Sequence, residues 1–141
     1  MIKTVRGLLA HGGQDRIRLS TIKGKVGYKI IKFQVIQEEP GEDNVELTMK
    51  IYKTKQTTIN NTVNFTDSDL LAVNYYQAAG TTYPHASRII FDNEIFNQDI
   101  YITVNDIAGG SKSGNYYLEL EVVELSEQGA EYTTLKDLRA Q

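Results

Sequence analysis

The sequence predicts an all-β protein, an antiparallel two-sheet β-sandwich that is jelly-roll-like and ends in a short helical or extended tail. Three observations favour this fold. Several segments alternate apolar and polar residues with a period of two, the pattern of a strand with one buried face. Turn residues separate these segments, and no long segment has the apolar spacing of a helix. About seven strands joined in this way are typical of a sandwich or a jelly roll.

Length and composition indicate one globular domain. The chain has 141 residues, of which 40% are hydrophobic and 23% are charged, so wholesale disorder is excluded. A net charge of −3 provides no basic field for phosphates, which argues against a nucleic-acid partner. The chain contains no cysteine, which excludes disulfides and thiolate metal sites. Without an apolar run of membrane-spanning or signal-peptide length, we expect no membrane partner and assembly in the cytoplasm.

Residues 1–27 are expected to form a basic, partly ordered arm with two short strands. Seven Lys or Arg residues occur up to Lys29, against one acidic residue, Asp15. Ile17 and Leu19 alternate with polar residues, and several glycines interrupt the segment. The arm is either a solvated edge or an element that docks on an acidic neighbour or a partner subunit. Its interface candidates are Arg6, Arg16 and Arg18.

The sandwich itself is expected to span residues 28–129, and a hairpin begins it. Residues 28–37 are rich in β-branched and aromatic residues, as strands are. Residues 38–44 contain Pro40 and Gly41 and are typical of a turn. Residues 45–51 alternate cleanly between apolar and polar positions, so we predict that they pair with the preceding strand.

The next segment, residues 54–66, is polar and rich in Thr and Asn. Val63 and Phe65 indicate a short strand within it. Its two Asn-X-Thr triplets, at Asn60 and Asn64, are expected to be chance features of a Thr/Asn-rich loop rather than glycosylation sites.

Residues 67–76 fit either a capped helical turn or a strand, and the alternation of their apolar residues favours the strand. We predict a loop over residues 77–87 and a short buried strand over residues 88–91. A long hairpin then organises the fold, with strands at residues 100–104 and 116–122. The Gly- and Ser-rich connection between them is too long for a two-residue turn and suits a mobile loop.

The tail, residues 130–141, is predicted to be a short helix or an extended segment. Leu135 and Leu138 lie three residues apart, which supports about one helical turn. Such a tail either frays or docks on a neighbouring subunit, so both leucines are interface candidates.

The sequence predicts no enzyme and no cofactor. Its two histidines, His11 and His85, lie in loop-like sequence, and no serine occupies a nucleophile elbow. Asp92, Glu94 and Asp99 form an acidic cluster and are the candidates for a cation site. Three interpretations of this cluster remain open: a solvated loop, a cation site or a catalytic pair. The pair Asp67 and Asp69 has the same interpretations.

Tyrosine is frequent, with nine residues against four Phe and no Trp. Tyr75 and Tyr76, together with tyrosines in later segments, suggest a platform for sugars or a surface for protein contacts. The alternative is ordinary filling of a β-sheet. Tyr75 and Tyr76 therefore complete the interface candidates.

The last third of the chain resembles a known family. It reads FDNEIFNQDIYITVND, then a short loop, NYYLELEVVELSE and a terminal TLKDLRAQ. This order, an acidic turn before an IYxT strand and a YYLELE strand before a Leu-Arg tail, is similar to small structural proteins encoded by marine bacteriophages. The resemblance implies a non-enzymatic, capsid-forming or capsid-decorating β-sandwich located in the virion.

The expected partners are therefore copies of the chain and other virion proteins, in a homo-oligomer that assembles by arm exchange. The alternative hypothesis is a carbohydrate- or receptor-binding sandwich that uses Tyr-rich loops, since this fold class hosts such modules equally well.

Overall fold

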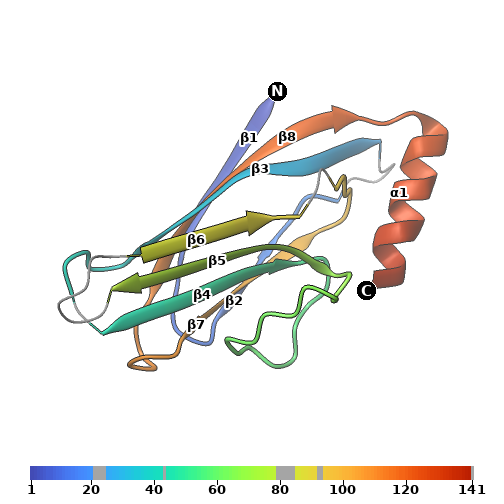
Figure 1. The fold of residues 1–141 in the computed structure, drawn as a ribbon. Coiled ribbons are helices and arrows are strands. Elements are labelled where there is room, and N and C mark those ends of the chain that lie inside the picture. The colour runs from blue at the N-terminus through green and yellow to red at the C-terminus, as the bar shows by residue number, and fades with distance from the viewer. Residues whose placement is uncertain (21–24, 43, 79–84, 92–93, 141) are drawn as a thin grey trace.

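The computed structural model describes residues 1–20, 25–42, 44–78, 85–91 and 94–140. Two antiparallel sheets face each other, and a C-terminal helix lies at one end of them (Figure 1). This confirms the predicted all-β two-sheet sandwich. The elements are β1 (Ile2–Leu9), β2 (Gln14–Ile17), β3 (Val26–Gln37), β4 (Val45–Tyr52), β5 (Leu70–Ala78), β6 (His85–Ile90), β7 (Ile100–Asp106), β8 (Gly114–Glu124) and α1 (Glu127–Ala140).

The strand order is that of a rolled-up hairpin. One sheet has three strands in the order β1-β8-β3, and the other has five in the order β2-β7-β4-β5-β6. The pairs β1 with β8, β2 with β7 and β4 with β5 are nested in sequence and antiparallel, as in a jelly roll. The sixth strand extends the larger sheet beside β5.

The two predicted hairpins, over residues 28–51 and 100–122, are both wrong. β3 and β4 belong to different sheets, and so do β7 and β8, so each connection crosses from one sheet to the other. An alternating pattern specifies which face of a strand is buried, and it leaves the pairing partner open. The two crossing connections lie side by side, where the Glu38 N–H donates to the Ser113 carbonyl at 3.1 Å and Lys112 pairs with Glu42.

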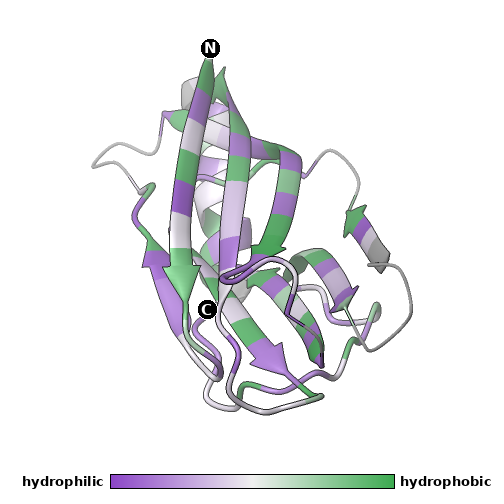
Figure 2. Cartoon of the chain, turned by 90° about the vertical axis from the view of Figure 1, so that its left-hand side faces the viewer, coloured by the Kyte–Doolittle hydropathy of each residue, from purple (hydrophilic) through white to green (hydrophobic). Residues whose placement is uncertain are grey.

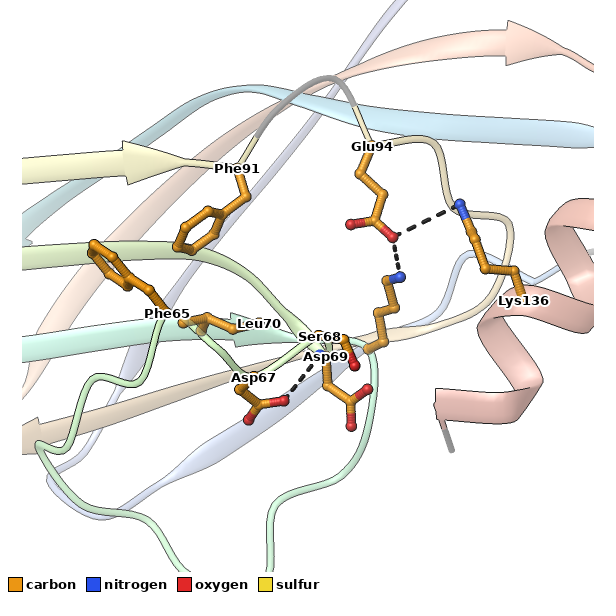
Figure 3. A pocket seen from close by; sticks show the side chains of 9 residues that line it. Phe65, Asp67, Ser68, Asp69, Leu70, Phe91, Glu94 and Lys136 are labelled. Carbon is orange, nitrogen blue, oxygen red and sulfur yellow. Dashed lines mark hydrogen bonds and ion pairs between the residues drawn. The ribbon is translucent and has the colours of Figure 1, made fainter.

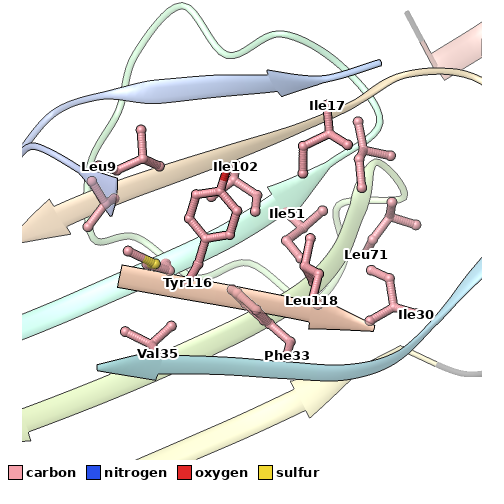
Figure 4. Close-up of a cluster of buried hydrophobic side chains, with 14 of the residues drawn as sticks. Leu9, Ile17, Ile30, Phe33, Val35, Ile51, Leu71, Ile102, Tyr116 and Leu118 are labelled. Carbon is pink, nitrogen blue, oxygen red and sulfur yellow. The ribbon is translucent and has the colours of Figure 1, made fainter. Parts of the chain in front are cut away.

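The core fills the space between the sheets. Hydrophobic and hydrophilic bands alternate along the strands (Figure 2), and the inward set comes from both sheets (Figure 4). Phe33 and Leu118 of the smaller sheet and Ile51 and Ile102 of the larger are fully buried. Tyr116 joins the layers, because its hydroxyl donates to the Asp15 carboxylate at 3.0 Å.

The segment expected to be a basic arm contributes a strand to each sheet. β1 forms an edge of the smaller sheet, and β2 forms an edge of the larger one. Asp99 holds the chain after β2, since its carboxylate accepts N–H groups from Leu19 and Ser20 and pairs with Arg16. The chain up to residue 17 is thus paired backbone rather than a free extension.

The polar segment after β4 departs from prediction. Residues 54–66, all of which the structure describes, form no strand, and Val63 and Phe65 are exposed. Both Asn-X-Thr triplets are Asx turns: the Asn60 and Asn64 side-chain oxygens each accept the N–H two residues later, at 3.0 Å. Local turns therefore outcompete strand pairing in this segment.

The strand favoured for residues 67–76 is confirmed as β5. The predicted loop over residues 77–87 is shorter than expected, since β5 continues to Ala78 and β6 begins at His85, and residues 79–84 lie outside the described residues. β6 is an edge strand rather than a buried one, with Ile89 exposed.

The tail is a helix, which is one of the two forms predicted for it. Ser126 caps it: its hydroxyl accepts the Gly129 N–H at 3.1 Å, and its carbonyl accepts the Ala130 N–H at 2.7 Å. In the described part of the chain no helix combines the length and the apolar character needed to cross a membrane.

Candidate functional site

Helix α1 contacts the sandwich mainly through polar side chains. Ala130, Thr133 and Asp137, at positions i, i+3 and i+7, form its buried side. The Asp137 carboxylate accepts the backbone N–H of Asn97 at 2.8 Å, and the Asn97 side-chain amide donates to the Thr134 hydroxyl at 2.6 Å. These directed bonds set the rotation of the helix about its own axis.

An ionic cluster reinforces this contact. Lys53, the residue after β4, pairs with Glu94 and lies 3.9 Å from the Asp137 carboxylate. Lys136 reaches the same Glu94 oxygen at 3.7 Å and donates to the Ile95 carbonyl at 2.8 Å. Burial raises the pKa of Asp137, even though the Asn97 N–H acts in the opposite direction. The cluster is mutually neutralising and ties the helix to two separate parts of the chain.

Three exposed apolar side chains lie on the opposite side of α1, which faces solvent. Tyr132, Leu135 and Leu138 are 70%, 59% and 49% exposed, and their spacing places them along one side of the helix. We call these three residues the apolar stripe. A surface helix normally buries its apolar side and exposes its polar side. In α1 this arrangement is reversed.

A pocket of about 590 Å³ opens beside the helix (Figure 3). Phe65 and Phe91 meet edge to face in it, with ring centroids 5.1 Å apart. The Asp67 carboxylate accepts the Asp69 N–H at 2.9 Å, and the paired Glu94, Lys53 and Lys136 close the other side. The lining residues are Lys53, Phe65, Asp67, Ser68, Asp69, Leu70, Phe91, Glu94 and Lys136.

A second hollow, of about 490 Å³, lies on the smaller sheet. We call it the sheet groove. Leu8 of β1 and Ile36 of β3 are 50% and 55% exposed, and both are paired to Asn115 of β8, so they flank it on the outer face. Side chains that line the groove are those of Arg6, Leu8, Gln34, Ile36, Asn115 and Tyr117.

The basic interface candidates of the N-terminal segment fall in different places. Arg6 lines the sheet groove. Arg16 pairs with Asp99 at 2.5 Å and so has a structural role between β2 and β7. Arg18 is exposed just after β2. Of these three arginines, only Arg6 lines one of the described hollows.

The cation candidates do not share one set of contacts. Asp92 lies outside the described residues. Glu94 pairs with lysines, whereas Asp99 pairs with Arg16 and accepts backbone N–H groups. Across the described ranges, no three His, Asp or Glu residues come together in a way that could hold a metal ion.

The tyrosine candidates point in opposite directions, because neighbours on a strand alternate between faces. The Tyr75 hydroxyl donates to Glu46 at 3.1 Å, while Tyr76 packs against the core. Tyr116 is buried, and the Tyr117 hydroxyl donates to Glu119. The tyrosines therefore form no common platform within the part of the chain described.

Sequence reasoning singled out Leu135 and Leu138, and the structure places both in the apolar stripe. It missed Leu8, Ile36 and Asn97. The sequence did contain a signal for Ile36, since residues 28–37 have apolar side chains at both odd and even positions, and therefore on both faces of the strand. No pattern marks Asn97, whose importance comes from a helix that is distant in sequence.

A scan against models of known protein families gave no match, and a search of curated proteins gave no significant match. The proposed function therefore rests on the geometry of the described residues.

Proposed function

We propose that this chain is a non-enzymatic structural subunit of a phage virion, which forms or decorates the capsid by associating with copies of itself. The observation that carries the proposal is the reversed helix α1. Its polar side is used within the molecule, and its apolar stripe is left for a partner.

The free energy gained by burying apolar side chains favours a partner for this stripe. Full burial of one Leu side chain contributes roughly 1.5–3 kcal/mol. Single exposed apolar residues are common on protein surfaces, but Tyr132, Leu135 and Leu138 are contiguous and share one helix face. A monomer gains nothing from this arrangement, whereas an assembly gains the burial of all three.

Two further features agree with a virion role. Jelly rolls with this nested strand order are common in viral capsid domains, an analogy at the level of fold. The last third of the chain is also similar to small structural proteins of marine bacteriophages. Lectins share the same fold class, so the analogy supports the proposal only together with the stripe.

Self-association is tested by size exclusion coupled to light scattering over a hundredfold range of protein concentration. We expect a mass above one copy that rises with concentration, and a monomer for the double variant Leu135→Glu/Leu138→Glu. The control is Ile107→Glu, which alters an equally exposed apolar residue outside α1. A wild-type protein that is monomeric at every concentration would contradict the proposal.

Substitutions are better tests here than truncations. Deleting residues 1–15 would remove β1 and half of β2, and therefore one edge of each sheet. A loss of assembly would then report a damaged fold. The virion location is tested separately, by mass spectrometry of particles purified to constant density from the virus that encodes the chain. Absence of its peptides would contradict this part of the proposal.

A second candidate function is carbohydrate binding, which the pocket beside α1 favours. An exposed aromatic ring next to carboxylates is the usual combination for a sugar ring, and Phe65 with Asp67 and Asp69 provides it. A glycan array with wild-type protein and Phe65→Ala tests it, with Tyr132→Ala as the aromatic control outside the pocket. Binding that Phe65→Ala abolishes would support this candidate, and no binding to any glycan would remove it.

A further inference from the structure

We infer that the apolar stripe of one copy binds the sheet groove of a second copy, in a head-to-tail contact. This inference rests on the proposed function and names the partner surface. Both surfaces carry exposed apolar side chains and have no intramolecular cover among the described residues.

The two surfaces lie at opposite ends of the molecule. β8 passes beneath the groove at Asn115 and Tyr117, runs on to Glu124 and leads into α1. Tyr117 and Glu124 are seven residues apart, which is about 23 Å along a strand. Figure 1 shows the helix at the end of the sandwich away from the β3–β4 and β7–β8 connections. One copy therefore cannot place its own stripe in its own groove.

Charge complementarity favours this pairing of surfaces. Arg6 is an exposed cation on the wall of the groove, and Glu131 is an exposed anion one helical turn before Leu135. Within the described residues neither side chain has an ion-pair partner. Arg6 is the one charged residue among those that line the groove, so the lining itself favours an incoming Glu131.

The contact joins two different surfaces, so it is heterologous. Such a contact generates a ring when the rotation between copies closes and an open chain when it does not. By contrast, a symmetric pairing of two stripes would stop at a dimer and leave both grooves uncovered. The two arrangements therefore differ in how variants complement one another.

A mixing experiment separates them. The stripe variant, Leu135→Glu/Leu138→Glu, keeps its groove, and the groove variant, Ile36→Glu, keeps its stripe. Each variant alone should be monomeric in light scattering, while an equimolar mixture should give a complex of two copies, since one intact contact is available. The matched control Ile107→Glu should assemble as wild type does, because Ile107 is 53% exposed against 55% for Ile36.

A charge reversal gives a second readout. Arg6→Glu and Glu131→Arg should each weaken association about two- to fivefold, and the combined variant should regain most of the loss. At a protein concentration low enough for wild type to be monomeric, circular dichroism and thermal unfolding of every variant should match wild type, because all the altered side chains are exposed.

The outcomes distinguish this inference from the proposed function. Wild-type assembly without any complex in the mixture would overturn the head-to-tail contact and leave self-association standing. A groove variant that still dimerises through its stripe would also overturn it, in favour of the symmetric pairing. A wild-type monomer at every concentration would overturn both.

Discussion

The interior of the sandwich and the contact between the sandwich and α1 are built from opposite kinds of side chain. Phe33, Ile102 and Leu118 fill the interior and are fully buried. Asn97 and Asp137 dominate the helix contact and are equally buried, but they are polar. Apolar burial is non-directional and proportional to area, whereas hydrogen bonds require a defined geometry.

The two contacts therefore contribute differently to the folded structure. Apolar burial between the sheets supplies most of the free energy of folding. A net hydrogen bond contributes only about 1 kcal/mol, and a buried ion pair can break even against its desolvation cost. The polar contact instead determines which side of α1 faces outward. We therefore expect the helix to detach locally at a lower free energy than that of global unfolding.

The largest effect is expected inside the sandwich. Phe33→Ala should lower the free energy of unfolding by about 3–5 kcal/mol, because a fully buried ring is lost and a cavity remains. Denaturant unfolding measures the loss, with Ile31→Ala, a half-exposed neighbour on β3, as the control. A loss below that of the control would contradict the assigned core.

An intermediate effect is expected for a polar contact within the sandwich, and it depends on pH. Burial alone would raise the pKa of Asp99, but the Ser20 and Leu19 N–H groups and Arg16 hold its pKa at about 2, below the ordinary 3.8. A depressed pKa contributes stability that is present above the unfolded-state pKa and is lost as the pH falls towards the folded-state value. The shift corresponds to about 2 kcal/mol.

Unfolding free energies measured from pH 6 to pH 2 test this contribution. Wild type should lose about 2 kcal/mol more than Asp99→Asn, mostly between pH 4 and pH 2. Glu124→Gln, which changes an exposed carboxylate outside both proposed contact surfaces, should follow the wild-type curve. Parallel curves for wild type and Asp99→Asn would contradict the assignment.

A smaller effect is expected at the helix contact. Asn97→Ala removes the amide that bonds Thr134 and should lower the free energy of unfolding by about 1–2 kcal/mol. By hydrogen exchange, the amides of α1 should show a lower opening free energy than the amides of β7 and β8, in wild type and in the variant. Gln128→Ala, which removes an exposed side-chain amide of the helix, is the control. Equal opening free energies in α1 and in the sheets would show that the helix and the sandwich unfold as one unit.

The smallest effect on stability is expected at the apolar stripe. Leu135→Glu should change the free energy of unfolding of the monomer by less than about 0.5 kcal/mol, because the side chain is exposed. Thermal unfolding at low protein concentration measures it. A loss comparable to that of Asn97→Ala would mean that the leucine packs within its own molecule.

Much of the strand content could be predicted from the sequence. The alternating segments became β3, β4, β7 and β8, and the favoured strand at residues 67–76 became β5. The error at Val63 and Phe65 arose because Asn60 and Asn64 close local turns that a period-two pattern does not register. The two false hairpins arose because alternation carries no information about strand pairing.

The candidate site was less predictable. Leu135 and Leu138 could be proposed from their spacing, but spacing alone does not reveal which side of a helix is buried. The outward side of α1 depends on Asn97, which lies about thirty residues before the helix and bonds it only in the folded chain.

The sequence by itself determined the class of fold and the buried face of most strands, because side-chain periodicity is a local property of the chain. Only the tertiary structure decided which strands pair, which sheet each one joins and which side of α1 meets solvent. Those choices depend on contacts between residues far apart in the chain. It also decided that the sheet groove lies at one end of β8 and the apolar stripe beyond the other end, so that one copy cannot bring the two surfaces together.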